Sequence, residues 1–110
     1  MESKFKYQFT QRADADLDDI VGYMTVELSD SKAASDFVDK LQQAIEETRL
    51  FPKGGFPVDN EYLPNTEIRK KKVGSYVMYY LPDFEEKTIF ILRIVYGKRN
   101  MDEILRHLEI

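Results

Sequence analysis

The chain has 110 residues, which is enough for one domain spanning residues 1–110 and too few for two. Its composition, 43% hydrophobic and 33% charged with a net charge of −4, is that of a globular protein and disfavours non-specific binding to nucleic acid. It has no cysteine and one histidine, which excludes disulfides, thiolate zinc sites and cysteine nucleophiles, and we expect no metal or other cofactor. With no signal peptide and no apolar run of membrane-spanning length, a cytoplasmic protein is expected.

The first half of the chain predicts a strand followed by two helices. Aromatic and polar residues alternate over residues 4–10, which is the period of a half-buried strand. Apolar residues then recur at helical spacing over residues 11–28, and a second apolar stripe follows over residues 34–52. The break at Ser29–Ser31 is short and offers good capping residues, so the two helices are expected to pack as antiparallel neighbours.

The second half predicts a loop, three strands and a short helix. The loop, over residues 51–64, is rich in proline and glycine. Strands are expected over residues 66–73, 76–81 and 87–96, and the last is apolar enough to be a central strand buried on both faces. A helix over residues 102–107 follows. We therefore predict an α+β domain of order β-α-α-β-β-β, with the helical hairpin on one face of a mainly antiparallel sheet and the other face partly open.

Four short motifs occur in order in this half. They are a basic strand at Arg69–Lys72, a Y-x-x-x-Y strand at Tyr76–Tyr80, an apolar strand at Ile89–Val95 and a Gly-Lys-Arg sequence at Gly97–Arg99. Behind an aromatic strand and a helical hairpin, this series resembles the RelE/ParE superfamily of bacterial toxins over nearly the whole chain. The resemblance implies a growth-inhibiting toxin of a type II toxin–antitoxin module, neutralised by a cognate antitoxin encoded beside it. RelE-like members cut messenger RNA on the ribosome, and ParE-like members inhibit DNA gyrase.

The resemblance assigns candidate catalytic, phosphate-binding cations to Arg69, Lys71 and Arg99. Metal-free cleavage of RNA needs such cations to hold the phosphate, together with groups that transfer protons. The three would line one face of the sheet if the strands keep their alternation, and a shift of one residue would exchange the two faces. Lys70 and Lys72 are expected to be solvated lysines that protect an edge strand.

Other side chains have both a structural and a functional interpretation. Tyr96 is a further candidate catalytic residue that stacks a base or relays a proton, or else it packs the end of its strand against the terminal helix. Arg93 interrupts an apolar strand, so it either pairs with an acid of the helices or points into the open groove, where Lys98 is also expected. Three tyrosines are expected to form core and cross-strand pairs, with base stacking as the alternative: Tyr76, Tyr79 and Tyr80.

Two positions depart from the RelE-like pattern. Val77 stands where those nucleases carry an arginine, and Leu105 stands where they carry a catalytic tyrosine. Losing one cation and one acid would weaken transition-state stabilisation substantially. We therefore favour a ParE-like gyrase inhibitor, with a ribosome-dependent endoribonuclease as the alternative and a non-toxic antitoxin-binding module as a third, so the sequence leaves open whether the chain is an enzyme.

Overall fold

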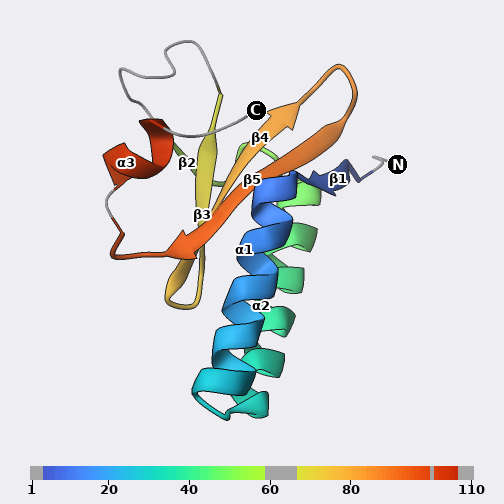
Figure 1. Ribbon diagram of the computed structural model, residues 1–110. Coiled ribbons are helices and arrows are strands. Elements are labelled where there is room, and N and C mark those ends of the chain that lie inside the picture. Colours follow the sequence, from blue (N-terminus) through green and yellow to red (C-terminus); the bar gives the residue numbers. More distant parts are fainter. Residues whose placement is uncertain (1–3, 59–66, 100, 107–110) are drawn as a thin grey trace.

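Two long helices lie against one face of a five-stranded sheet (Figure 1). The computed structural model describes residues 4–58, 67–99 and 101–106, and the sheet order is β1-β5-β4-β3-β2. The neighbours β1 and β5 are parallel, and the remaining pairs are antiparallel. The predicted α+β class and mainly antiparallel sheet are confirmed. The strands are β1 (Lys6–Phe9), β2 (Phe56–Pro57), β3 (Arg69–Val73), β4 (Tyr76–Asp83) and β5 (Thr88–Tyr96).

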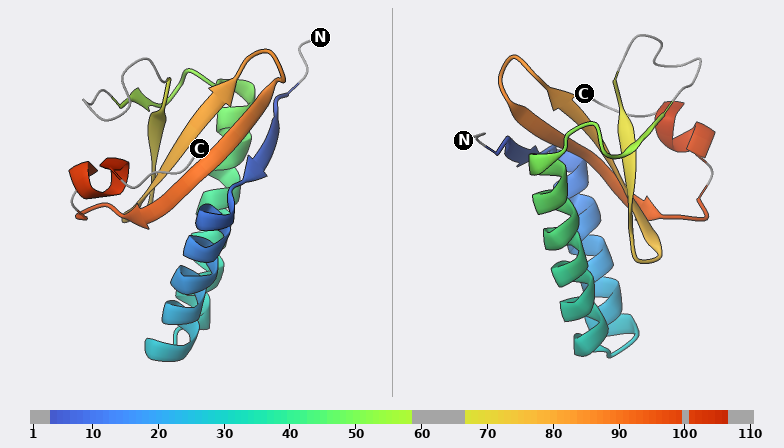
Figure 2. Two further views of the ribbon diagram at one scale, coloured as in Figure 1. Left: turned by 45° about the horizontal axis from the view of Figure 1, so that its top comes forward. Right: turned by 180° about the vertical axis from the view of Figure 1, so that it is seen from behind.

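The helical hairpin extends beyond the edge of the sheet, with its two arms side by side (Figure 2). Thr10 caps the first arm by accepting a hydrogen bond from the amide of Ala13, and Asp30 caps the second through the amide of Ala33. From Tyr23 the first arm changes from α to π hydrogen bonding, which the apolar period had not indicated. The arms consist of α1 (Gln11–Gly22), the π-helical η1 (Tyr23–Glu27) and α2 (Ser31–Leu50).

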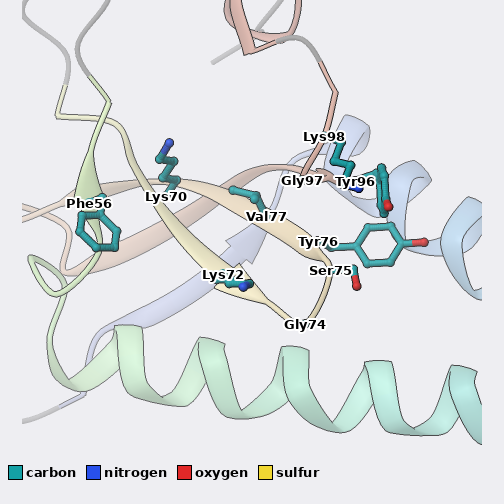
Figure 3. Close-up of a pocket in the computed structure, with 10 residues that line it drawn as sticks. All are labelled: Phe56, Lys70, Lys72, Gly74, Ser75, Tyr76, Val77, Tyr96, Gly97 and Lys98. Atoms are coloured by element: carbon teal, nitrogen blue, oxygen red, sulfur yellow. The ribbon is translucent and has the colours of Figure 1, made fainter.

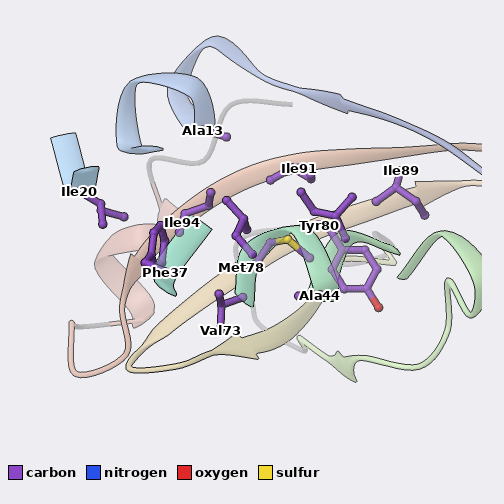
Figure 4. Packing of buried hydrophobic residues seen from close by; sticks show 12 residues of the cluster. Ala13, Ile20, Phe37, Ala44, Val73, Met78, Tyr80, Ile89, Ile91 and Ile94 are labelled. Carbon is purple, nitrogen blue, oxygen red and sulfur yellow. The ribbon is translucent and has the colours of Figure 1, made fainter. Parts of the chain in front are cut away.

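The larger hydrophobic core lies between the hairpin and the sheet. Apolar side chains on one face of α2, such as Phe37, meet side chains of β4 and β5, such as Met78 and Ile94 (Figure 4). Full burial of a side chain of this size stabilises a fold by about 1.5–3 kcal/mol relative to exposure. This layer therefore fixes the hairpin against the sheet.

The opposite face of the sheet carries a smaller apolar cluster. Ile104 and Leu105 of α3 (Met101–Arg106) are buried there with Tyr79 and Leu92 of the sheet. This face was expected to be partly open, and within the described residues α3 covers part of it. The terminal helix was expected over residues 102–107, of which residue 107 lies outside the described residues.

Two features of the strands were not predicted. Phe56–Pro57 pairs with β3 as a short edge strand, although residues 51–64 were expected to be a loop. The strand β4 continues through Pro82, which pairs with Ile89 of β5. A proline is tolerated there because β3 pairs with β4 only as far as Tyr80, so no neighbouring strand on that side needs an amide hydrogen from Pro82.

A buried ion pair joins α1 to β5. The guanidinium of Arg93 donates to both carboxylate oxygens of Asp16, with Nε–Oδ2 2.7 Å and Nη2–Oδ1 3.2 Å, and both residues are buried. The same Oδ2 accepts the amide of Ile94 at 3.0 Å. Since β1 pairs with β5 only up to Ile91, Asp16 provides the acceptor that a neighbouring strand would otherwise provide. Arg93 was expected either to pair with an acid of the helices or to point into the open groove. The structure shows the first arrangement.

The variant Asp16→Asn should be strongly destabilised, because it leaves the charge of Arg93 buried without a counter-ion. We expect the free energy of unfolding to fall by about 3–5 kcal/mol, as measured by urea denaturation. The control is Asp18→Asn, an exposed position on the same helix, which should change this free energy by less than about 0.5 kcal/mol. Equal losses in the two variants would contradict the role given to the buried pair.

Candidate target-binding groove

A hollow of about 590 Å³ lies where the β3–β4 turn meets the end of β5. Among the described residues, its lining combines lysines, aromatic rings and small residues and includes no acidic residue. We call this hollow the groove. Its lining residues, shown in Figure 3, are Phe56, Lys70, Lys72, Gly74, Ser75, Tyr76, Val77, Tyr96, Gly97 and Lys98.

Alternation along β3 decides which basic side chains reach the groove. Lys70 and Lys72 line it, whereas Val73 belongs to the core beneath the hairpin. Arg69 and Lys71 alternate with these lysines and therefore share the side of Val73. The lysines expected to be solvated thus line the groove, and the two cations expected to be functional do not.

Arg69 and Lys71 have structural partners on their own side of the sheet. Nζ of Lys71 lies 3.0 Å from Oε2 of Glu47 on α2, and its hydrogen bond lowers the pKa of that carboxyl. Nη1 of Arg69 donates to the carbonyl oxygens of Lys53 and Gly55, at 3.2 and 2.8 Å. The first side chain ties the sheet to the hairpin, and the second ties it to the loop before β2.

The groove is cationic although the chain is acidic overall. Lys70, Lys72 and Lys98 form no ion pair with any residue in the described part of the chain. Val77 lies between them (Figure 3) and gives the groove an apolar floor. Lys98 also lines the groove. Arg99 follows in an exposed turn, where its amide donates to the Tyr96 carbonyl at 3.0 Å, and it is not among the lining residues.

Aromatic rings stand at both ends of the groove (Figure 3). At one end the rings of Tyr76 and Tyr96 meet edge to face, with centroids 5.8 Å apart, and Tyr76 also contacts Phe37 of α2 at 5.0 Å. Burial raises the pKa of Tyr76. At the other end stands Phe56, which is 74% exposed. Tyr96 therefore packs against Tyr76 of the neighbouring strand and remains 45% exposed on its groove side.

A set of hydrogen bonds holds the backbone of the loop that precedes Phe56. The Tyr80 hydroxyl donates to the carbonyl of Pro52 and accepts the amide of Gly55, both at 2.9 Å. A Cβ on Gly55 would lie 2.5 Å from that hydroxyl and 2.8 Å from the carbonyl oxygen of Lys70, so this position has no room for a side chain. We call these bonds, together with those of Arg69 to the same loop, the loop latch. Tyr80 is thus a core residue, as expected, with this added structural role.

The two departures from the nuclease pattern have different settings. Val77 lies in the groove itself, where it replaces a cation by an apolar group. Leu105 is buried in the cluster beneath α3 and contributes to packing. Within residues 4–58, 67–99 and 101–106 there is no group of three acidic or histidine side chains positioned to hold a metal ion, and no helix long and apolar enough to cross a bilayer.

The fold is that of the RelE/ParE superfamily of toxins. The sequence pattern of one family, described as the ParE toxin of the type II toxin–antitoxin system, parDE, matches residues 7–101. The chain therefore belongs to this family and is a toxin of the type II class. Comparison with curated proteins gives no match.

Solved structures of toxin–antitoxin proteins share the fold. A chain of the chromosomal ParDE system from P. aeruginosa is 22% identical with a TM-score of 0.66, over 86% of this chain and 98% of that one. A chain of the RelBE2 complex from Mycobacterium tuberculosis is 21% identical with a TM-score of 0.60, over 87% and 94%. A chain of the archaeal RelE–RelB complex from Pyrococcus horikoshii is 15% identical with a TM-score of 0.53, over 89% and 100%. At these identities the likeness concerns the fold alone.

Alanine at two glycines should have opposite effects on stability. In Gly55→Ala the new Cβ meets the Tyr80 hydroxyl and the Lys70 carbonyl, and the free energy of unfolding should fall by about 1–3 kcal/mol. In Gly22→Ala, at the end of α1, no atom lies within 4 Å of the new Cβ, and a gain of about 0.5–1 kcal/mol is expected. Thermal unfolding measures both. A Gly55→Ala variant as stable as the parent would argue against the loop latch.

Tyr80 should make the fold sensitive to alkaline pH. Burial raises the pKa of its hydroxyl, against smaller lowering effects of the Gly55 amide and the charge of Arg69. A pKa raised in the folded state stabilises the fold fully below the unfolded value of about 10, and this contribution is lost as the pH rises through the folded value.

The variant Tyr80→Phe should therefore lose less stability than the parent between about pH 9 and pH 11. At neutral pH it should be less stable by about 1–2 kcal/mol, because two hydrogen bonds are lost. Urea denaturation at several pH values measures both effects. Tyr96→Phe is the control for removing a half-exposed hydroxyl and should change stability by less than about 0.5 kcal/mol. Parallel pH profiles of Tyr80→Phe and the parent would show that Tyr80 does not contribute.

Proposed function

We propose that this toxin inhibits DNA gyrase without cutting nucleic acid, and that a cognate antitoxin neutralises it in the cytoplasm. The observation that supports this most is the chemistry of the groove. Metal-free cleavage of RNA needs groups that remove and return protons beside the phosphate. Among the described residues, the groove has Val77 at its floor and neither a carboxylate nor an imidazole in its lining, which suits binding of a partner better than acid–base catalysis.

A RelE-like endoribonuclease is the second candidate, and one observation favours it. Three lysines that form no ion pair with a described residue meet Tyr96 in the groove, and lysine ammonium groups bind the phosphates of nucleic acids. Against it, the cations that the resemblance assigned to catalysis, Arg69 and Lys71, lie on the helix side of β3 and have structural partners there. Their catalytic role, and that of Arg99, stay predictions.

Two assays with purified protein separate the candidates. With gyrase, plasmid and ATP, we expect covalent cleavage complexes that appear as linear DNA after denaturation and proteolysis. With ribosomes programmed with message, we expect the message to remain intact. Cleavage at codon positions that disappears in Arg99→Ala, without gyrase complexes, would refute gyrase inhibition and support the ribonuclease.

Induced expression without an antitoxin tests toxicity itself. We expect growth arrest that co-expression of the neighbouring gene relieves. Normal colony growth at verified protein levels would refute both activities and leave a module that only binds its antitoxin.

A further inference from the structure

We propose that two copies of this chain associate head to tail, each placing the tip of its helical hairpin in the groove of the other. The tip comprises residues 23–30, where η1 ends and the chain turns into α2. The proposal goes beyond the inhibition of a target, because it concerns how free toxin covers its own groove. It rests on the shape and charge of the tip, the opposite charge of the groove and the position of both at one end of the molecule.

The tip exposes apolar side chains at the far end of the hairpin, clear of the sheet (Figure 2). Val26 is 73% exposed, Leu28 is 53% exposed and Tyr23 is 52% exposed. Single exposed apolar side chains are ordinary on protein surfaces. Here they follow one another closely at an extremity of the molecule, and they form a patch that a partner can cover.

Main-chain hydrogen bonds hold the tip in one shape. The amide of Leu28 donates to the carbonyl of Tyr23 at 3.0 Å, and the amide of Asp30 donates to the carbonyl of Met24 at 2.9 Å. The carboxylate of Asp30 also caps α2 through the amide of Ala33. Because the backbone of the tip is already ordered, little conformational freedom is lost when the tip is buried against a partner.

Acidic residues flank this apolar patch. The outer half of the hairpin, residues 18–39, has one basic residue, Lys32, which pairs with Asp36 at 3.0 Å. Glu27 lies between Val26 and Leu28 and forms no ion pair within the described part of the chain. This charge repels nucleic acids and anionic lipids, so the tip fits a protein surface that is both basic and apolar. The acids of the outer half are all exposed: Asp18, Asp19, Glu27, Asp30, Asp36 and Asp39.

The groove of a second copy is such a surface. Lys70 and Lys72 project from β3 and Lys98 follows β5, around the half-buried Val77 (Figure 3). None of these lysines is neutralised by a described carboxylate. A tip whose Val26 is seated on Val77 would bring opposite charges together and remove apolar surface from water on both partners.

The tip and the groove are neighbours at one end of the molecule. Met24 of the tip and Tyr76 of the groove line a smaller hollow, of about 240 Å³, between the hairpin and the β3–β4 turn. Met24 also packs against the core beneath the hairpin, which keeps the tip from folding over the groove of its own chain. A second copy, turned by a two-fold rotation, can place its tip on this groove and receive the first tip in return. Two such contacts close a dimer, the commonest form of symmetric oligomer.

Sedimentation velocity of the purified toxin tests whether it associates. We expect a monomer at about 1 μM and a dimer at about 100 μM, as for a small interface. The dissociation constant should rise about 10-fold when the salt concentration is raised from about 50 mM to about 500 mM, because salt screens the charges of the tip and the groove.

Two charge reversals test the contact itself. Glu27→Lys changes the tip, and the double variant Lys70→Glu, Lys72→Glu changes the groove; each should weaken the dimer about 10-fold. The matched control is Glu85→Lys, an exposed position in the turn between β4 and β5, at the end of the sheet away from the tip (Figure 1), and it should stay within about twofold of the parent. An equimolar mixture of the tip variant and the groove variant should associate again. The mixed dimer pairs an intact tip with an intact groove, and a basic tip with an acidic groove.

Three results would overturn the head-to-tail dimer. They are a parent that stays monomeric at about 100 μM in low salt, equal losses in Glu27→Lys and Glu85→Lys, and a mixture of the two variants that does not associate. Circular dichroism checks that each variant folds, and if the groove variant does not, the tip variant, its control and the salt dependence still decide. None of these results bears on the toxin function, which the gyrase and growth assays measure separately.

Discussion

The fold depends on the carboxylate of Asp16. This carboxylate accepts a main-chain hydrogen bond from β5 that a longer β1 would otherwise accept. β1 is too short to accompany β5 along its whole length, so the amide of Ile94 would lack an acceptor at a buried edge. Asp16 accepts this amide and also neutralises Arg93. Burying either charge alone would be costly, so the helix and the strand each require the other.

A bulge in β5 determines which side chains of this strand enter each of the two cores. Tyr79 pairs with Arg93 and Tyr80 pairs with Ile91, so β5 has one extra residue, Leu92, opposite β4. This bulge changes the alternation: Ile91 and Ile94 both join the core beneath the hairpin, three residues apart, and Leu92 joins the cluster under α3. Because β5 contributes side chains to two cores along its length, its sequence is apolar almost throughout. Its last residue, Tyr96, pairs with Tyr76, and both rings line the end of the groove.

Periodicity in the sequence was sufficient for the helices and the long strands, and insufficient for the site. On β3 the clues conflict, because Ile68 and Val73 are both buried but lie an odd number of residues apart, on opposite faces. The four consecutive cations between them show no alternation, so they do not indicate which side chains face which side of the sheet. β2 has two residues, too few for any period, so Phe56 carried no signal of its position. The partner of Arg93 lies 77 residues away in the chain, and only the folded structure identifies it.

The run of four cations on β3 has a consequence for how this edge tolerates change. If the strand slipped by one residue, Arg69 and Lys71 would replace Lys70 and Lys72 over the groove, and the groove would remain positive. What the slip would lose is the burial of Val73 and the pair with Glu47. The sign of the groove is therefore robust to insertions or deletions near the turn, whereas the positions of its charges depend on the packing of the opposite face.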